Sequence, residues 1–404
     1  MPAPGAVPLG ADQHMLAESG KMMTTDRTAI RRRLAIRRTA HRPPSGGWKA
    51  AGHRSILAPL AATIAATVAV GVGVAIARAG RERRPEPERE PDLRLGLLPG
   101  ETLPAGLKRM AIWQVDGAIA QLQGNGTAAS PRAVHETRKA LKRLRALVRV
   151  LEGELGRKET ARENAALAST ARLLAGARDA EVLLDTLDTL IARHPGKLAR
   201  RKGVAQLRRR LAAECDSAQR RALGDPATRA RAIGELRAFR ERVLAWDLSA
   251  REGIVIVEPG LTRLYAQGRR RWRRVENGKG ERVREMHEWR KRVKDLRYIA
   301  EMLSLRGKGT GKGDARLRRI ASRADSLGEL LGDEHDLAVL AEWIRVNGKR
   351  RLPRLGRKTR RTLLKLIERR RRELRRHALR DGERLYRDSP KRFMRRIRAA
   401  RGAR

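Results

Sequence analysis

The strongest constraint on the fold of this chain is a basic helical pattern that occurs twice. The first copy is VHETRKALKRLR, from Val134 to Arg145, and the second is MHEWRKRVKDLR, from Met286 to Arg297. Each copy has a His followed by Arg, Lys, Lys and Arg at the same offsets, and 152 residues separate the copies. A repeat of this kind predicts two similar structural units, each with a cationic surface. We therefore expect an anionic ligand held between two halves.

Each copy separates into an apolar stripe and a cationic face when it is turned at about 100° per residue. The first stripe runs from Val134 to Leu151, and the second repeats it from Met286 to Leu303. The candidate binding residues are His135, Arg138, Lys139, Lys142 and Arg145 in the first copy and His287, Arg290, Lys291, Lys294 and Arg297 in the second. Arg149 extends the first face and is a secondary candidate.

A charged helix face is usually the solvated side of an amphipathic helix, and such a face carries both signs. Here the neighbouring charges are alike, which costs an isolated helix about 0.2–0.5 kcal/mol per pair. The repetition of this arrangement favours a ligand. Guanidinium groups bind phosphate oxygens through two parallel hydrogen bonds, while Lys supplies a flexible point charge. The pattern therefore suits a repetitive chain of phosphates, and each His adds a donor whose pKa the surrounding cations should lower.

The composition points to the same class of partner. The net charge is +48, with 93 Lys and Arg against 45 Asp and Glu, so we expect nucleic acid, an anionic membrane surface or a phosphate polymer. A hydrophobic fraction of 41% is sufficient for helical cores, and an aromatic fraction of 3% with few alternating β-branched runs favours an all-α fold. The single cysteine, Cys215, excludes an internal disulfide framework and a Cys-based zinc cluster.

No constellation for catalysis is evident. Neither His has a second metal ligand at suitable spacing on its own face, and paired acids and a GxxxxGK[ST] loop are absent from the sequence. We therefore expect a protein that is not an enzyme and that uses neither metal nor cofactor.

The N-terminal part divides into three segments before the helical body. Residues 1–54 are expected to be a disordered basic tail, and residues 79–96 a charged Pro-rich linker. Between them, residues 55–78 contain 22 consecutive uncharged residues, from Ile56 to Ala77, which predicts a single transmembrane helix. A buried Ala-rich helix, a cleaved signal peptide and a wrongly assigned start codon remain alternatives. We expect a membrane-anchored protein with a cytoplasmic helical domain, or a cytoplasmic or granule-associated one if no span exists.

The body is expected to contain two pseudo-repeated four-helix bundles. Repeat one covers residues 101–223, a bridging helix follows at 227–247, and repeat two covers 254–401. A second landmark recurs as ARDAEVLLDTL and EHDLAVLAEWI, in which Arg178 aligns with His335 at a spacing of 157. Arg178 and His335 are further secondary candidates. The five extra residues fit the Gly- and Lys-rich loop from Arg306 to Arg316.

These motifs resemble the CHAD family, the conserved histidine α-helical domain. The resemblance covers residues 97–401 and rests on VHETRKALKRLRALVRVL with ARDAEVLL, on MHEWRKRVKDLRYIAEML with LLGDEHDLAVL, and on the opening segment LLPGETLPAGLKR. It implies two pseudo-symmetric four-helix bundles with a basic central groove that binds inorganic polyphosphate through the ten candidate residues. Two departures, Asp295 opposite Arg143 and His335 opposite Arg178, predict unequal halves.

We expect non-enzymatic binding of polyphosphate, with granule association or membrane scaffolding as the cellular role. The alternative is a nucleic-acid-binding basic helical protein, which the net charge and the run RRRWRR from Arg269 to Arg274 favour. Few aromatic residues are available to stack on bases, so nucleic acid is expected only as a weak electrostatic competitor.

Overall fold

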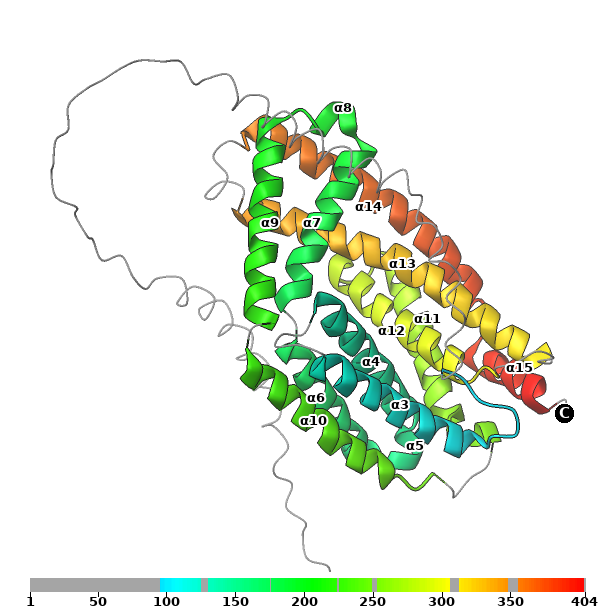
Figure 1. Cartoon of the computed structure of the whole chain (residues 1–404). Coiled ribbons are helices and arrows are strands. Elements are labelled where there is room, and N and C mark those ends of the chain that lie inside the picture. The colour runs from blue at the N-terminus through cyan, green and yellow to red at the C-terminus, as the bar shows by residue number, and fades with distance from the viewer. Residues whose placement is uncertain are drawn as a thin grey trace, which may run out of the picture. The chain divides into compact units, whose positions relative to one another are not determined.

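The chain folds into a helical body, which is shown in the computed structural model of Figure 1. The structure describes residues 95–124, 130–174, 176–223, 225–248, 253–305, 312–347 and 355–402. These residues form α-helices, one 3-10 helix and an isolated parallel bridge between Leu97 and Leu305. The predicted all-α class is therefore confirmed.

The predicted membrane span, residues 55–78, lies outside the described residues, as do the expected tail and nearly all of the linker. Within the described ranges, every helix is too short or too polar to cross a bilayer.

The first half of the body consists of a series of helices, of which α3, α4 and α10 begin at capping side chains. Thr102 and Ser130 cap α3 and α4, and a Pro occupies the first turn of each helix, where its missing amide proton costs nothing. The helices are α3 (Leu103–Gln123), α4 (Pro131–Val150), α5 (Glu152–Leu155), α6 (Arg157–Leu173), α7 (Gly176–Arg193), α8 (Pro195–Leu198), α9 (Lys202–Leu223) and α10 (Pro226–Leu244).

The second half has a similar order, but two of its helices, α13 and α14, are longer than any helix of the first half. Its elements are η1 (Gly253–Ile256), α11 (Glu258–Glu276), α12 (Arg282–Met302), α13 (Lys312–Asn347), α14 (Arg357–Tyr386) and α15 (Pro390–Gly402). The two predicted basic helices are α4 and α12. The continuous helix α13, of 36 residues, stands where the first half has α6 and α7, because α6 ends at Leu173.

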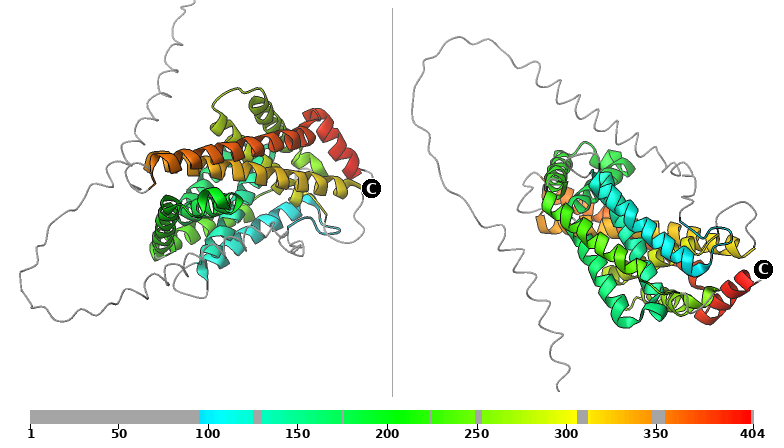
Figure 2. Two further views of the ribbon diagram at one scale, coloured as in Figure 1. Left: turned by 90° about the horizontal axis from the view of Figure 1, so that it is seen from above. Right: turned by 60° about the horizontal axis from the view of Figure 1, so that its bottom comes forward.

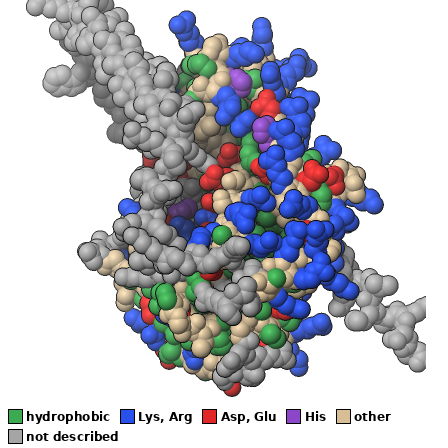
Figure 3. Space-filling model, turned by 90° about the vertical axis from the view of Figure 1, so that its right-hand side faces the viewer, with side chains coloured by type: hydrophobic (Ala, Val, Ile, Leu, Met, Phe, Trp, Pro, Cys, Tyr) green, Lys and Arg blue, Asp and Glu red, His purple; other side chains and the backbone are tan. Residues whose placement is uncertain are grey.

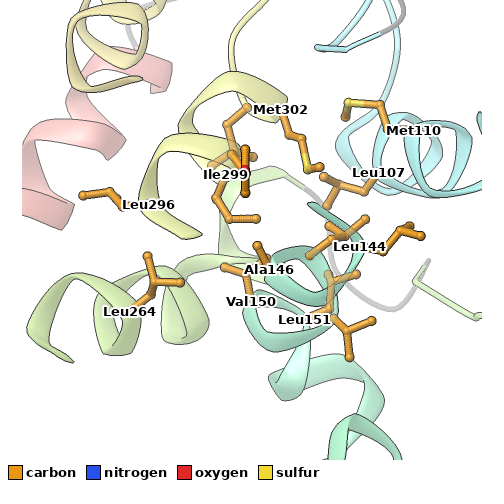
Figure 4. Close-up of a cluster of buried hydrophobic side chains, with 14 of the residues drawn as sticks. Leu107, Met110, Leu144, Ala146, Val150, Leu151, Leu264, Leu296, Ile299 and Met302 are labelled. Carbon is orange, nitrogen blue, oxygen red and sulfur yellow. The ribbon is translucent and has the colours of Figure 1, made fainter. Parts of the chain in front are cut away.

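The buried apolar side chains form two cores, and each core draws on both halves of the sequence. The larger core joins α3, α4, α10, α11, α12, the first part of α13 and α15. Figure 4 shows its centre, where Leu144 and Val150 of α4 lie near Ile299 and Met302 of α12. The smaller core joins α7 and α9 with the second part of α13 and the first part of α14. The two basic helices therefore pack directly against each other.

Residues 227–247, which were expected to bridge the repeats, mostly form α10. This helix packs against α3 and α6 of the first half, and α15 packs against α11 and α13 of the second half. In the two views of Figure 2, α13 and α14 run side by side along the length of the second half, in agreement with their extensive packing.

Candidate anion-binding site

The second basic helix, α12, and the neighbouring α13 bring two histidines together. The ring centroids of His287 on α12 and His335 on α13 are 4.5 Å apart, and the ring planes are tilted by 36°. Arg290, Lys291 and Lys294 follow His287 along α12, and we call these five residues the α12–α13 site. The predicted secondary candidate His335 thus lies beside the second predicted set.

Three nitrogen atoms of the α12–α13 site are buried without a hydrogen-bond partner among the described residues. They are Nδ1 of His287, Nδ1 of His335 and Nε of Arg290. A buried donor or acceptor that lacks a partner costs about 1–3 kcal/mol, so most such atoms in proteins are satisfied. Their concentration at one place indicates a surface that is complementary to a polar ligand.

Two glycines of α13 make room for the cations of α12. A Cβ atom at Gly332 would lie 3.2 Å from Nη2 and 3.4 Å from Nε of Arg290, which is tighter than ordinary van der Waals contact. A Cβ at Gly328, one turn earlier, would lie 3.7 Å from Cγ of Lys294. The absence of a side chain at Gly332 therefore lets the Arg290 guanidinium rest against the backbone of α13. Sequence reasoning missed both glycines, although their spacing of four just before the second landmark was a usable signal.

Burial and like charges keep both imidazoles neutral near pH 7. The pKa of His287 is lowered to about 4, mainly by burial and also by His335, Lys291 and Arg290, while Glu288 acts in the opposite direction. Burial also lowers the pKa of His335 to about 4. Arg290, Arg371 and Lys291 contribute to this second shift. A bound anion would favour the protonated form of both rings and oppose these shifts.

Lys294 is the most perturbed lysine of the site. Its pKa is lowered to about 8, mainly by burial and also by Arg290 and Arg297, while Asp325 and Asp336 oppose the shift. Lys294 therefore remains mostly charged at neutral pH, but its charge is lost at a much lower pH than that of an ordinary lysine.

Two other predicted residues of the second copy have acidic partners. Arg297 pairs with Glu301, Nε to Oε1 at 2.7 Å, and also with Asp325. Lys291 donates from Nζ to Glu288 Oε1 at 2.7 Å, and this pair lies near the surface. Arg297 therefore contributes less net charge to the site than the sequence pattern suggested.

The first predicted set lies on α4. His135 and Lys142 are exposed, whereas Arg138 donates from Nη1 to the carbonyl oxygen of Leu174 at the end of α6, at 3.0 Å. Lys139 forms a long ion pair of 3.5 Å with Glu136. The structure therefore spreads this set along the exposed and half-buried sides of α4.

Arg145 is the most buried cation of the first set. Its Nε atom is buried and has no described hydrogen-bond partner. Burial lowers the pKa of Arg145 and the nearby Arg149 lowers it further, while Asp295 of α12 raises it. The end of the first set therefore lies close to α12.

Asp295, which interrupts the basic pattern of the second copy, joins the two halves. Its Oδ1 atom is 2.8 Å from Nη1 of Arg149 on α4, and its Oδ2 atom is 3.1 Å from Nη1 of Arg292 on its own helix. Only 6% of Asp295 is exposed. The secondary candidate Arg149 is therefore part of an ion pair between α4 and α12.

Arg143, the counterpart of Asp295, also faces α12. Its guanidinium carbon lies 5.8 Å from the ring centroid of Tyr298. Burial lowers the pKa of Arg143, while the charge of Glu301 raises it. In this interface α4 supplies two arginines and α12 supplies two acids, so the departure at position 295 has a packing role.

The remaining secondary candidate, Arg178, lies on α7, where the structure describes the backbone but not this side chain. Leu187 of α7 and Leu340 of α13 belong to the same core. The two helices that carry the second landmark therefore pack against each other.

A buried ion cluster fixes α14 to α13 next to His335. Glu334, only 1% exposed, accepts hydrogen bonds from Nε of Arg371 at 3.0 Å and from Nη1 of Arg375 at 3.2 Å. Both arginines also pair with Glu368. Sequence reasoning missed this cluster, because a buried carboxylate looks like a surface residue until its partners are known.

The match to a known family covers most of these features. The sequence model of the CHAD domain matches residues 114–345. The chain belongs to the CHAD family. The match includes both basic helices and both copies of the second landmark, whereas α14 and α15 of this CHAD protein lie beyond it. No curated protein matches the chain. Within the described residues, His, Cys, Asp and Glu side chains form no cluster of three that could hold a metal ion.

Proposed function

We propose that this CHAD protein binds inorganic polyphosphate without hydrolysing it. The observation that carries the proposal is the α12–α13 site, where two imidazole nitrogens and one guanidinium nitrogen are buried without a partner among the described residues. Lys291 and Lys294 flank these groups, so the surroundings are cationic. Phosphate oxygens supply both the acceptors and the negative charge that such a site lacks.

Each group of the site has a distinct part in this proposal. Arg290 binds one phosphate through two parallel hydrogen bonds, and the absence of a side chain at Gly332 gives its guanidinium room beside α13. Lys291 and Lys294 supply point charges to neighbouring phosphates. His287 and His335 take up protons as the polymer approaches, and this uptake increases the charge of the site only when ligand is bound.

The equivalent face of α4 supplies the second part of the binding surface in this proposal. Its residues are His135, Arg138, Lys139, Lys142 and Arg145, and they correspond one by one to His287, Arg290, Lys291, Lys294 and Arg297. α4 packs directly on α12, and in this proposal one polymer chain contacts both faces. The two halves contribute unequally, because Arg297 is engaged with two acids.

Nucleic acid is the alternative ligand, since a net charge of +48 attracts any phosphate polymer. Salt dependence cannot separate the two ligands, because both neutralise cations through phosphates. Competition can do so: we expect polyphosphate to displace labelled duplex DNA from the full chain at a much lower phosphate concentration than the reverse. Equal displacement in both directions would contradict a preference for polyphosphate. Release of inorganic phosphate from the bound polymer would contradict the non-enzymatic part of the proposal.

A further inference from the structure

A second row of cations lies on the outer side of α14, apart from the α12–α13 site. Its members are all exposed, and we call them the α14 ridge: Arg361, Lys365, Arg369, Arg372, Arg376 and Arg380. Their spacings of four, four, three, four and four residues keep them within an arc of about 100°. At 1.5 Å per residue the ridge is about 28 Å long.

The ridge points away from the protein body. The buried residues Leu363, Ile367 and Leu374 lie on the opposite side of α14 and belong to the smaller core. The row is straight, because its mean spacing is close to the helical period of about 3.6 residues. Figure 3 shows that Lys and Arg side chains cover much of the face it displays, with fewer Asp and Glu side chains among them.

Acidic partners are almost absent from the ridge. Arg369 lies 3.5 Å from Glu373, and this pair is exposed. Among the described residues the other five cations form no close ion pair, although the charge of Arg372 acts on Glu368 and lowers the pKa of that carboxyl. An exposed face whose only role is solubility mixes both signs, as Arg210 and Glu214 do on α9. The six like charges repel one another along the helix, and an anionic polymer removes this repulsion.

The shape and composition of the α14 ridge exclude some anionic ligands and fit others. The phosphates of a duplex wind around its axis, so they would contact a straight row of cations only where a strand crosses that row. A single-stranded nucleic acid binds through aromatic side chains on which its bases stack. The ridge has no aromatic residue. Insertion into a membrane surface needs large apolar side chains, and those that are exposed in the described residues lie outside α14. A flexible, unbranched phosphate chain satisfies these constraints.

We propose that the α14 ridge is a second binding site for inorganic polyphosphate, which a long chain occupies together with the α12–α13 site. The inference rests on the proposed function and adds a separate surface to it. One helix borders both sites, because Arg371 and Arg375 on its buried side hold Glu334 next to His335. A chain that reaches both sites gains avidity, whereas a short chain does not.

The test compares two triple variants of the full chain. The ridge variant carries Lys365→Gln, Arg372→Gln and Arg376→Gln, and the control carries Arg209→Gln, Arg231→Gln and Arg237→Gln on the exposed faces of α9 and α10. Affinity is measured by titration over a range of salt concentrations. The ligands are long-chain polyphosphate, an oligophosphate too short to reach both sites, and single-stranded DNA.

We expect the ridge variant to bind long-chain polyphosphate about tenfold more weakly than the control. The slope of log affinity against log salt should fall by about 2, since each lost phosphate contact on a single strand contributes about 0.7. Affinity for the short oligophosphate should be the same in both variants.

Three other outcomes would count against the proposal. If the ridge variant and the control variant bound long-chain polyphosphate with equal affinity, the ridge would not be a binding site. The proposal for the α12–α13 site would be unaffected. An equal loss for single-stranded DNA and polyphosphate would make the ridge an unselective cationic surface. A wild-type chain that binds neither polyphosphate would instead refute the proposed function itself.

Discussion

At the scale of single residues, the adjacent imidazoles of His287 and His335 are the central feature of the α12–α13 site. His287 and His335 are neutral near pH 7, because burial and the neighbouring cations lower their pKa values to about 4. A neutral imidazole can donate a hydrogen bond without adding to the repulsion among Arg290, Lys291 and Lys294. The site therefore holds its cations close together at a lower electrostatic cost than a fully charged cluster.

The lowered pKa values predict acid sensitivity of the ligand-free protein. The unfolded chain binds protons at both histidines near the ordinary value of 6.5, whereas the folded chain binds them near 4, so stability falls as the pH is lowered through this range. Thermal unfolding should show this loss for the wild type. The double variant His287→Gln, His335→Gln should show a smaller dependence in the same range, and an unchanged dependence would contradict the assignment.

The lowered pKa of Lys294 predicts that the affinity for polyphosphate also depends on pH. Its pKa is about 8 in the ligand-free protein, and bound phosphate raises it, so polyphosphate affinity should decrease as the pH rises above about 8. The variant Lys294→Arg keeps its charge and should bind with little change up to pH 9 or so. Titration at several pH values checks this, and parallel profiles for both proteins would exclude Lys294 as the cause.

At the scale of elements, the interface between α4 and α12 explains why the duplicated helices are not identical. Arg143 and Arg149 of α4 face Glu301 and Asp295 of α12. Two copies with the fully basic pattern would place like charges in a buried interface. The divergence at position 295 therefore gives the two halves complementary surfaces.

Removal of Asp295 should destabilise the protein strongly. Asp295→Ala leaves Arg149 and Arg292 without their buried counter-charge, and we expect a loss of about 2–3 kcal/mol in the free energy of unfolding. The control Glu241→Ala removes an exposed acid 3.6 Å from Arg240 and should cost less than about 0.5 kcal/mol. Denaturant unfolding measures both, and equal stabilities would show that the Asp295 ion pairs do not hold the interface.

The sequence predicted the elements better than their contacts. The positions of α4 and α12 and their apolar stripes follow from helical periodicity, and the all-α class and the family are confirmed. The pairing of Arg297 with Asp325 and the contact between the rings of His335 and His287 depend on which face of α13 meets α12. The hydrophobic periodicity of a sequence shows which residues share a face of one helix. It does not show how two helices are aligned against each other, so these contacts were not predictable.

At the scale of the whole molecule, the two sequence halves share their hydrophobic cores. Leu187 of the first half and Leu340 of the second are buried in one cluster, and Leu144 and Ile299 are buried in the other. The duplication is therefore visible in the order of the helices. Each hydrophobic core, however, contains side chains from both copies. The relative position of the two cationic helices is fixed by this shared packing.

We also propose that residues 55–78 anchor the protein to a membrane, because they contain an uncharged stretch long enough to span a bilayer. The full chain should sediment with membranes after high-salt and carbonate washes. The chain that lacks residues 1–80 should remain in the supernatant. Release of the full chain by either wash would contradict an integral membrane anchor and favour electrostatic adsorption.

The central claim is that specific side chains of α4 and α12, and not total charge, bind polyphosphate. The direct test is a titration of long-chain polyphosphate into the double variant Arg138→Glu, Arg290→Glu and into the control Arg209→Glu, Arg237→Glu, which has the same net charge. With helical content retained by circular dichroism, we predict an affinity loss of about 100-fold or more for the first variant, since each charge-assisted hydrogen bond contributes about 1.5–3 kcal/mol. Equal affinities of the two variants would show that binding is diffuse attraction to a cationic surface.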